Sequence, residues 1–492
     1  MSDVVIVVNG LSRRFGERWA LRGVTLRVRR GEMFAAVGAD GSGKTTLMQS
    51  LCAILDPTEG RVSVAGLDSV KDAARITARL GYMSQAYSLY GDLTVEENLR
   101  FFAALHRVPG PTAQARIARL MRFAGLSAFL QRLARDLSGG MQKKLALCCS
   151  LIHEPDIMVL DEPTLGVDPR SRRELWRILE EYRTAEKTVV IATSYIDEAE
   201  RCDRVAFFDA GRMIACDRPA AFGADLEAAL AAMLPARAPA AVVPFPSRTP
   251  TGDAIAVRGL ARSFGAFKAV DGISFEVRRG EVFGLLGPNG SGKSTTIRVL
   301  CGILEPSAGE VRVAGIDVVR QAEAVRGRIG YMSQKFSLYL DLSVRENIAF
   351  FGGAYGLNRG EIEERARWVL AAAGLQGSEG MLTRSLSGAL RQRLALGCAL
   401  LHQPEVLFLD EPTAGVDPAS RRTFWTLIAA IARSGTAVLV TTHYLREAEG
   451  CDRVAFIDRG RLLALDAPQR LRDAYGGVPL EEVFFRLLEA AP

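Results

Sequence analysis

The chain of 492 residues is too long for a single hydrophobic core, and its length predicts two or more domains. Its composition, 48% hydrophobic and 24% charged, is that of ordinary soluble globular proteins. The net charge of +6 is too small for this length to indicate a polyanionic partner, and no run of eighteen apolar residues predicts a membrane span.

Short apolar runs alternate with amphipathic patterns along the first half of the chain. The patterns predict, in chain order, a strand at 33–38, a helix at 114–125, a strand at 157–161, a helix at 169–182 and strands at 188–193 and 204–209. This alternation predicts an α/β layered core with a parallel sheet.

The second half of the chain repeats the first in constant register. Each motif recurs 249 residues later, as Lys44 and Lys293 illustrate, and "LSRRFG" near the start returns as "LARSFG". Such a register indicates a tandem duplication. We expect domains at 1–233 and 254–492, joined by a linker at 234–253 whose Pro- and Ala-rich composition favours an extended, semi-rigid tether.

The eight cysteines do not have the spacing of metal ligands. Cys148 and Cys149 are adjacent, and three cysteines of the first half recur in the second: Cys52, Cys149 and Cys202 as Cys301, Cys398 and Cys451. We therefore expect small buried thiols that were copied by the duplication. The start of the chain lacks a charged-then-apolar segment with a small-residue cleavage site, so a cytoplasmic protein is expected.

Two glycine-rich loops fit a phosphate cradle. "GADGSGKT" (38–45) and "GPNGSGKS" (287–294) match G-x-x-x-x-G-K-[ST], and each follows an apolar strand and opens a helix. Backbone N–H groups and the helix N-terminus would face the phosphates, and the lysine would neutralise the β and γ oxygens. The hydroxyls of Thr45 and Ser294 are placed for Mg²⁺. The expected nucleotide-binding residues are Gly38, Gly41, Ser42, Gly43, Lys44, Thr45 and Thr46 in the first loop and Gly287, Asn289, Gly290, Ser291, Gly292, Lys293, Ser294 and Thr295 in the second.

An acidic pair follows a predicted strand in each half. In "IMVLDEP" and "VLFLDEP" the aspartates, Asp161 and Asp410, can hold a metal ion through water. The glutamates that follow, Glu162 and Glu411, can orient or deprotonate an attacking water. The sequence therefore predicts ATP and Mg²⁺ as ligands of both halves.

Further motifs complete a resemblance to a known family. "LSGG" or "LSGA" precedes a helix in each half, and "GYMSQ" lies between this motif and the glycine-rich loop. With these motifs each half resembles a nucleotide-binding domain of the ATP-binding cassette (ABC) family. The resemblance implies an α/β fold of two tandem P-loop NTPase domains. Each would have a RecA-like parallel-sheet core, an antiparallel β subdomain and a helical subdomain.

The resemblance also implies roles for individual residues. Phe15 and Phe264 match the aromatic residue that stacks on adenine, and Gln85 and Gln334 match the glutamine that senses the metal and the γ-phosphate. Asp168 and Asp417 lie in the "GVD" loop that meets the partner domain. The signature residues are Ser138, Gly139 and Gly140 in the first half and Ser387 and Gly388 in the second.

The position of the family's switch histidine, which contacts the γ-phosphate, differs between the halves. His443 is present in the second half, but Ser194 replaces it in the first. In this family two domains associate head to tail, so that each ATP lies between the P-loop of one domain and the signature of the other. The departures from the family pattern can therefore be sorted by composite site.

Site one joins the first P-loop to the second signature and contains most of the departures from the family pattern. It contains Ser194, an extra negative charge at Asp40 where the other loop has Asn289, and Ala389 and Leu390 in place of Gly and Gln. Site two joins the second P-loop to the first signature and departs only at Met141. We therefore expect site one to bind ATP more readily than it cleaves ATP, and site two to turn over.

The segments after the two glutamines resemble the ATPases of drug and polysaccharide exporters with ABC-2 type permeases. In those proteins a permease helix docks here, and the candidate contacts are Tyr87, Tyr90, Phe336 and Tyr339. The whole chain is similar to the tandem ATP-binding subunits of ABC-2 multidrug exporters. The resemblance implies one copy per complex, bound through two permease subunits to the inner face of the cell membrane.

Other tandem ATPases share part of this pattern. ABC-F factors, which act on ribosomes, carry a long charged helical linker, and sugar-importer ATPases would not be expected to carry the exporter-type text "LTVxEN". A DNA-repair ATPase would need long insertions or zinc-ligand cysteines. The first two remain as alternatives, and no nucleic-acid partner is expected.

Overall fold

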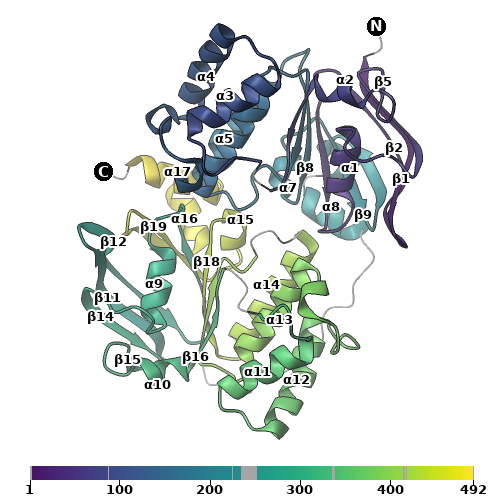
Figure 1. Cartoon of the computed structure of the whole chain (residues 1–492). Coiled ribbons are helices and arrows are strands. Elements are labelled where there is room, and N and C mark those ends of the chain that lie inside the picture. Colours follow the sequence, from purple (N-terminus) through teal and green to yellow (C-terminus); the bar gives the residue numbers. More distant parts are fainter. Residues whose placement is uncertain are drawn as a thin grey trace. The chain divides into compact units, whose positions relative to one another are not determined.

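The computed structural model describes residues 3–86, 88–223, 225–233, 252–334, 338–413, 416 and 418–490. The chain divides into two compact units close to residue 236. Both units have the same order of strands and main helices, which confirms the duplication (Figure 1). The proposed linker lies outside the described residues except for Gly252 and Asp253, and Asp253 begins strand β11.

Each unit begins with a four-stranded antiparallel sheet. The order is β2-β1-β4-β5 in the first unit and β12-β11-β14-β15 in the second. Burial alternates along β2, so one face of this sheet packs on the core. The strands are β1 Val4–Phe15, β2 Arg18–Arg29, β4 Glu59–Val64 and β5 Leu67–Asp68, then β11 Asp253–Phe264, β12 Phe267–Arg278, β14 Ala308–Val313 and β15 Ile316–Asp317.

A six-stranded sheet forms the centre of each unit. The order is β10-β9-β3-β8-β7-β6 in the first unit and β16-β17-β18-β13-β19-β20 in the second, with five parallel strands and one antiparallel edge strand. The strands are β3 Met33–Gly38, β6 Leu80–Met83, β7 Ile157–Asp161, β8 Thr188–Thr193, β9 Arg204–Asp209 and β10 Arg212–Asp217, then β13 Val282–Leu286, β16 Ile329–Met332, β17 Val406–Asp410, β18 Ala437–Thr442, β19 Arg453–Asp458 and β20 Arg461–Asp466.

The four predicted strands coincide with β3, β7, β8 and β9, and the predicted parallel sheet is confirmed. Every residue of β3, β7 and β8 is buried, as expected for a parallel sheet covered on both faces. Alternate residues of β3 enter different cores: Met33, Ala35 and Val37 join one, and Phe34 and Ala36 join the other.

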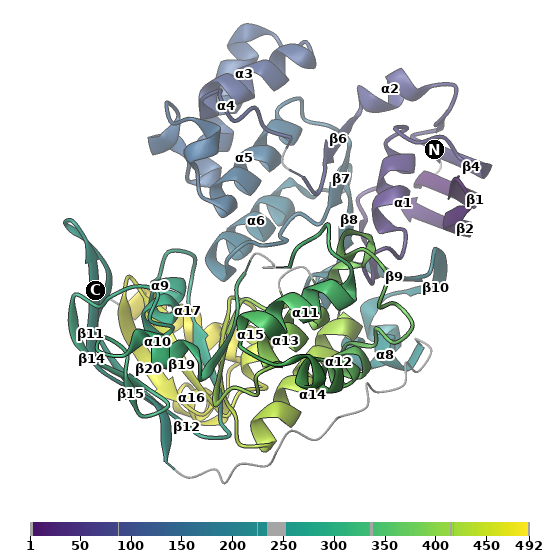
Figure 2. The same ribbon diagram turned by 60° about the horizontal axis from the view of Figure 1, so that its bottom comes forward.

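Helices cover this sheet and form a separate group around α3, α4 and α5 (Figures 1 and 2). The helices of the first unit are α1 Lys44–Leu51, α2 Ala73–Thr77, α3 Val95–Leu105, α4 Gly110–Ala124, α5 Gly139–Leu151, α6 Pro169–Tyr182, α7 Ile196–Ala199 and α8 Leu226–Met233. Those of the second are α9 Lys293–Leu300, α10 Ala322–Arg326, α11 Val344–Ala354, α12 Arg359–Ala373, α13 Gly388–Leu400, α14 Pro418–Arg433, α15 Leu445–Ala448, α16 Pro468–Ala474 and α17 Leu480–Ala490. Short 3₁₀ turns lie at Ser127–Phe129, Ala134–Asp136, Pro219–Phe222 and Thr383–Ser385.

The predicted helix at 169–182 coincides with α6, but the boundaries of the helix predicted at 114–125 need correction. Helix α4 starts four residues earlier, because Pro111 lies in the first turn, where a missing N–H breaks no helical hydrogen bond. It ends one residue earlier, because Gly125 adopts a left-handed conformation with φ 67 and caps the helix.

All eight cysteines are free thiols, and the seven named above are buried, as predicted. Burial raises the pKa of the Cys148 thiol to about 12, so this thiol is unreactive. Within the part of the chain that the structure describes, no helix is both long enough and apolar enough to cross a bilayer.

Candidate nucleotide-binding sites

The first glycine-rich loop connects β3 to α1 and forms a pocket. Gly43 adopts φ 104 just before the helix, a conformation that favours glycine. A Cβ on Gly38 would lie 2.2 Å from the carbonyl oxygen of Phe208, so only glycine fits there. The Lys44 ammonium donates to the Gly38 carbonyl at 2.7 Å and is held inside the loop. The pocket measures 540 Å³, a size suited to a nucleotide, and among its lining residues are Phe15, Asp40, Gly41, Gly43, Lys44, Thr45, Thr46, Gln85 and Glu162.

The second loop has the same construction between β13 and α9. Gly292 has φ 105, and a Cβ on Gly287 would lie 2.1 Å from the Ile457 carbonyl oxygen. The Lys293 ammonium donates to the Gly287 carbonyl at 2.8 Å. Asn289, Gly290 and Ser291 lie in the loop, and Ser294 and Thr295 lie in the first turn of α9.

One serine in each loop is buried with an unused hydroxyl. The Oγ atoms of Ser42 and Ser291 have no hydrogen-bond partner among the residues that the structure describes, although each side chain is 2% exposed. A buried hydroxyl without a partner is costly. A phosphate oxygen in the loop would supply one.

The predicted metal-binding side chains meet in both units. The Thr45 hydroxyl lies 3.2 Å from Asp161 Oδ1, and the Ser294 hydroxyl lies 3.3 Å from Asp410 Oδ1. The second oxygen of Asp161 is buried without a partner among the described residues. Oxygen donors of this kind fit Mg²⁺, which keeps several waters and takes few protein ligands. The described ranges contain no cluster of three or more His, Cys, Asp or Glu residues that could hold a metal ion.

In the second unit, Glu411 lies at the centre of a polar cluster. Gln334 Nε2 donates to Glu411 Oε2 at 2.7 Å, and His443 Nδ1 lies 3.2 Å from the same oxygen. Burial by itself raises the pKa of Glu411. His443, Lys293 and Gln334 together outweigh this effect and bring the pKa below its ordinary value. Glu411 is therefore held as a carboxylate, the form that can accept a proton from water.

In the first unit, Ser194 donates hydrogen bonds to both carboxylate oxygens of Glu162. Its hydroxyl donates to Oε1 at 2.6 Å, its backbone N–H donates to Oε2 at 3.1 Å, and the Lys44 ammonium lies 3.5 Å from Oε1. Burial raises the pKa of Glu162 despite these contacts. The two glutamates, equivalent in sequence, therefore differ in the direction of their pKa shifts.

Two further differences between the halves bear on the carboxylates, and sequence reasoning missed both. The Thr441 hydroxyl donates to Asp410 at 2.6 Å and accepts from the Glu411 N–H at 3.0 Å, whereas the first half has Ala192 at this position. Lys143 donates to the backbone carbonyls of Gln85 and Glu162, whereas the second half has Gln392. The first difference was visible beside Ser194, since "ATS" aligns with "TTH".

These pKa directions predict opposite effects of pH on the stability of two isosteric variants. Because Glu162 binds its proton more tightly in the folded chain, ionisation destabilises the fold as pH rises above 4.5, the ordinary value. Because the pKa of Glu411 is lowered, its contribution is present above 4.5 and is lost as pH falls through the folded pKa. At pH 7 we expect Glu162→Gln to raise the Tm of its unit and Glu411→Gln to lower it.

Calorimetric unfolding of the full chain between pH 4 and pH 8 checks these two expected changes in Tm. Both differences in Tm should shrink toward the acid end, because protonation of the carboxyl groups removes the charge from which each difference arises. Shifts of the same sign at pH 7 would contradict the assignment.

The two aromatic residues predicted to stack on adenine are both exposed. Phe15 lines the first pocket and is 48% exposed, and the Arg13 guanidinium lies 4.9 Å from the centroid of its ring. Phe264 is equally exposed and has Arg262 at 4.8 Å. An exposed ring beside a cation suits a planar, electron-rich base.

The two signature serines begin helices. Ser138 caps α5 and Ser387 caps α13, each accepting a backbone N–H at 3.4 Å. Gly139 and Gly388 form the first turns of these helices. A Cβ on Gly140 would lie 2.5 Å from Ser171 Oγ, so this glycine lets α5 and α6 approach closely, whereas the second half has a buried Ala389. Asp168 caps α6 through the Ser171 N–H, and Asp417 lies outside the described residues.

Comparison with known proteins decides the family. The sequence pattern described as "ABC transporter" matches residues 21–165 and again 270–414. The chain belongs to the ABC transporter family. It is therefore an ATP-binding subunit of the kind that hydrolyses ATP to power transport, as its sequence predicted.

Several relatives of this ABC protein are known. The "Probable multidrug ABC transporter ATP-binding protein YbhF" of Escherichia coli is 36% identical over 99% of this chain and 98% of its own length. The "Daunorubicin resistance ATP-binding protein DrrA3" of Streptomyces coeruleorubidus is 42% identical over 47% of this chain and 73% of its own. The "Ribose import ATP-binding protein RbsA" of Cereibacter sphaeroides is 32% identical over 94% of both chains.

In this ABC protein, the segment "LTVEEN" contains the start of helix α3, and exposed aromatic rings lie beside it. Thr94 and Glu97 make a capping box at the start of α3, and Asn98 hydrogen-bonds the backbone of Tyr90 in both directions. Tyr90 is 50% exposed and makes an edge-to-face contact with Phe101, which is 38% exposed. The second unit repeats the arrangement with Asn347, Tyr339 and Phe350, whereas Tyr87 and Phe336 lie outside the described residues.

Proposed function

We propose that this chain is the ATP-hydrolysing subunit of an ABC-2 type exporter of drugs or other amphiphiles. The whole-length similarity to the E. coli protein and the partial similarity to the daunorubicin resistance protein support export. The relative named for ribose import has a lower identity. ATP with Mg²⁺ is the expected energy source, and Thr45, Ser294, Gln85, Gln334, Asp161 and Asp410 are the residues that would hold the metal.

The exposed aromatic pairs support contact with membrane subunits. Tyr90 with Phe101, and Tyr339 with Phe350, present rings to solvent at the same place in each unit. Exposed apolar patches mark interaction sites, and tyrosine is enriched among the residues that contribute most to binding. Two permease subunits, one for each half, would bring the chain to the inner face of the cell membrane.

We further propose that the two ATP sites work unequally. The observation that supports this most strongly is the contrast around the two glutamates. Glu411 is contacted by Gln334 and His443 and kept ionised, whereas Glu162 is tied to Ser194 and Lys44 and has a raised pKa. A base must be able to reach water. Both oxygens of Glu162 accept from Ser194, whereas the contacts of Gln334 and His443 fall on Oε2 of Glu411, so Glu411 is better placed for hydrolysis than Glu162.

In the head-to-tail association implied by the family, site two would combine Lys293, Glu411 and His443 with the signature at Ser138. Mg²⁺ neutralises phosphate charge when bound. His443 would contact the γ-phosphate, and Glu411 would orient and deprotonate the attacking water. Site one would combine Lys44 and Glu162 with the signature at Ser387 and hold ATP as a clamp.

Nucleotide exchange tests the clamp. The chain, purified with its permease subunits, is loaded with radiolabelled ATP and then chased with excess unlabelled ATP. We expect about one labelled nucleotide per chain to exchange slowly and to be recovered as ATP, and the second to turn over quickly. Equal, fast exchange of both nucleotides would contradict the proposal.

A further inference from the structure

A second pocket lies in the first unit, outside the nucleotide site. It measures 830 Å³ and is formed by α4, the C-terminal ends of α5 and α6, and the segment that leads to β8. None of its lining residues lines the first nucleotide pocket. Its volume lies within the range of about 300–1,000 Å³ that is usual for small-molecule sites.

The wall of this pocket is apolar, and its rim is cationic. Leu120, Phe123, Leu151, Ile178 and the ring of Tyr182 supply the wall. The lining residues include four cationic side chains and only two carboxylates: Arg119, Arg122, Arg177 and Lys187, and Glu154 and Glu181. The lining therefore carries an excess of positive charge next to apolar surface.

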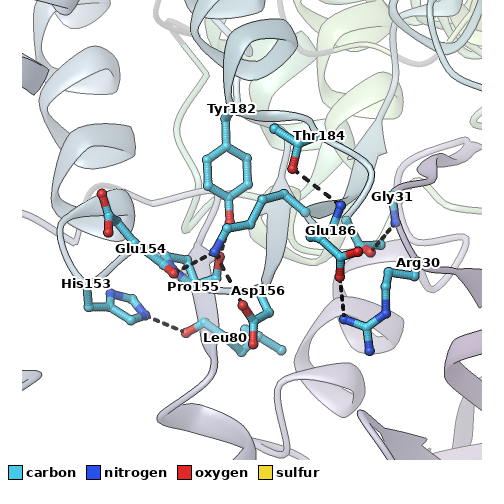
Figure 3. Close-up of polar contacts among 12 residues, drawn as sticks. Arg30, Gly31, Leu80, His153, Glu154, Pro155, Asp156, Tyr182, Thr184 and Glu186 are labelled. Atoms are coloured by element: carbon cyan, nitrogen blue, oxygen red, sulfur yellow. Dashed lines mark hydrogen bonds and ion pairs between the residues drawn. The ribbon is translucent and has the colours of Figure 1, made fainter. Parts of the chain in front are cut away.

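Part of this rim is already neutralised. Glu154 accepts from Arg119 at 2.5 Å and from Arg116 at 2.6 Å. The Lys187 ammonium donates to the carbonyls of Glu154 and Pro155 at 2.8 and 2.7 Å. The Tyr182 hydroxyl donates to the Pro155 carbonyl, and Figure 3 shows the Tyr182 side chain pointing toward Pro155. These contacts fix the wall and leave those groups little capacity for a ligand.

Two guanidinium groups of the rim have N–H donors that remain available for a ligand. Arg122 has no side-chain partner among the residues that the structure describes, and Arg177 lies 4.0 Å from Glu181, with its guanidinium 5.4 Å from the centroid of the Phe123 ring. An exposed ion pair at that distance is weak. Arginine binds planar anions through paired N–H groups, so both side chains can receive one.

The second half of the chain lacks this lining. At the positions 249 residues later, Arg122 and Phe123 become Ala371 and Ala372, Arg177 becomes Thr426 and Tyr182 becomes Ile431. A charged face kept only for solubility would be expected in both copies of the repeat. The cations and rings therefore belong to a feature of the first unit alone.

We infer that this pocket binds a small, dissolved organic anion that has an apolar body, either a ring system or a short chain, and a single carboxylate, sulfonate or phosphate group. The body lies on Phe123, Ile178 and Tyr182, and the anionic group lies between Arg122 and Arg177. The pocket can contain both parts of such a molecule, and this favours a dissolved ligand over a lipid held in a bilayer.

Fluorescence titration with 8-anilinonaphthalene-1-sulfonate tests this inference on the full chain. Excess MgADP is present to fill the nucleotide sites. The variant Arg122→Ala with Arg177→Thr installs the residues that the second half already has, and we expect it to bind the probe about tenfold more weakly. The control, Arg61→Ala with Arg212→Thr, removes the same charge from exposed positions on β4 and β10 and should bind like the wild type.

Further measurements make the outcome decisive. N-phenyl-1-naphthylamine has the same rings without the sulfonate, and its affinity should be equal in wild type and variant. If the double variant does not fold, Arg122→Ala alone changes only an exposed side chain and should still weaken binding. Equal sulfonate affinity in wild type and variant overturns the site. Flotation of the wild type, but not the variant, with phosphatidylglycerol vesicles replaces the dissolved ligand with a lipid and overturns that part of the inference.

Discussion

Replacing Glu411 with Gln should nearly abolish ATP hydrolysis, whereas Glu162→Gln should leave most of it. Glu411 is the glutamate whose pKa is lowered and whose oxygen is contacted by Gln334 and His443, so it can accept a proton from water. A positioned general base contributes about 10²–10⁴-fold to the rate. The measurement is steady-state ATP turnover of each variant, purified with its permease subunits.

The two variants control for each other. Each exchanges one carboxylate oxygen for an amide nitrogen at the same position of the repeat, and both keep the phosphate-binding lysines Lys44 and Lys293. Both should therefore still bind two nucleotides per chain. If each variant loses about half of the turnover, the two sites are equivalent and Ser194 is a tolerated substitution.

Much of the fold follows from the sequence because the central strands are buried on both faces. Runs such as "MFAAVG" and "TVVIAT" have no polar residue to expose except at their ends, so their limits are visible, and they match β3 and β8. The start of α4 lies before the amphipathic pattern, because its first turn holds Gly110, Pro111 and Thr112, and proline is tolerated in a first helical turn.

The candidate sites were found from motif spacing, but their electrostatics depend on packing. The motif "GADGSGKT" predicts the phosphate-binding loop. The opposite pKa shifts of Glu162 and Glu411, however, arise from burial and from neighbours that lie far apart in the sequence. The role of Thr441 likewise depends on the pairing of β17 with β18, which places its hydroxyl against Asp410. Aligned text shows that Ala192 differs from Thr441, and only the geometry shows what the hydroxyl contacts.

Exchanging the residues at the histidine position should move turnover in opposite directions. His443→Ser removes the side chain beside Glu411 and should lower turnover by about 10²-fold, because serine is too short to reach the γ-phosphate. In the other half, Ser194→His combined with Ala192→Thr removes the hydroxyl that donates to Glu162 and restores the histidine and threonine of the second unit. Tested in the Glu411→Gln background, this pair should raise the residual turnover.

The outcome distinguishes two physical explanations of the asymmetry. If the restored pair raises turnover, the contacts made by Ser194 and the missing threonine hydroxyl limit the first site, and the clamp is a property of its P-loop half. If His443→Ser is impaired but the restored pair gains nothing, the limit lies elsewhere, with Asp40, Ala389 and Leu390 as the remaining departures. If His443→Ser keeps full turnover, the histidine does not contribute to hydrolysis, and the serine at the equivalent position carries no information about how the two halves divide the reaction.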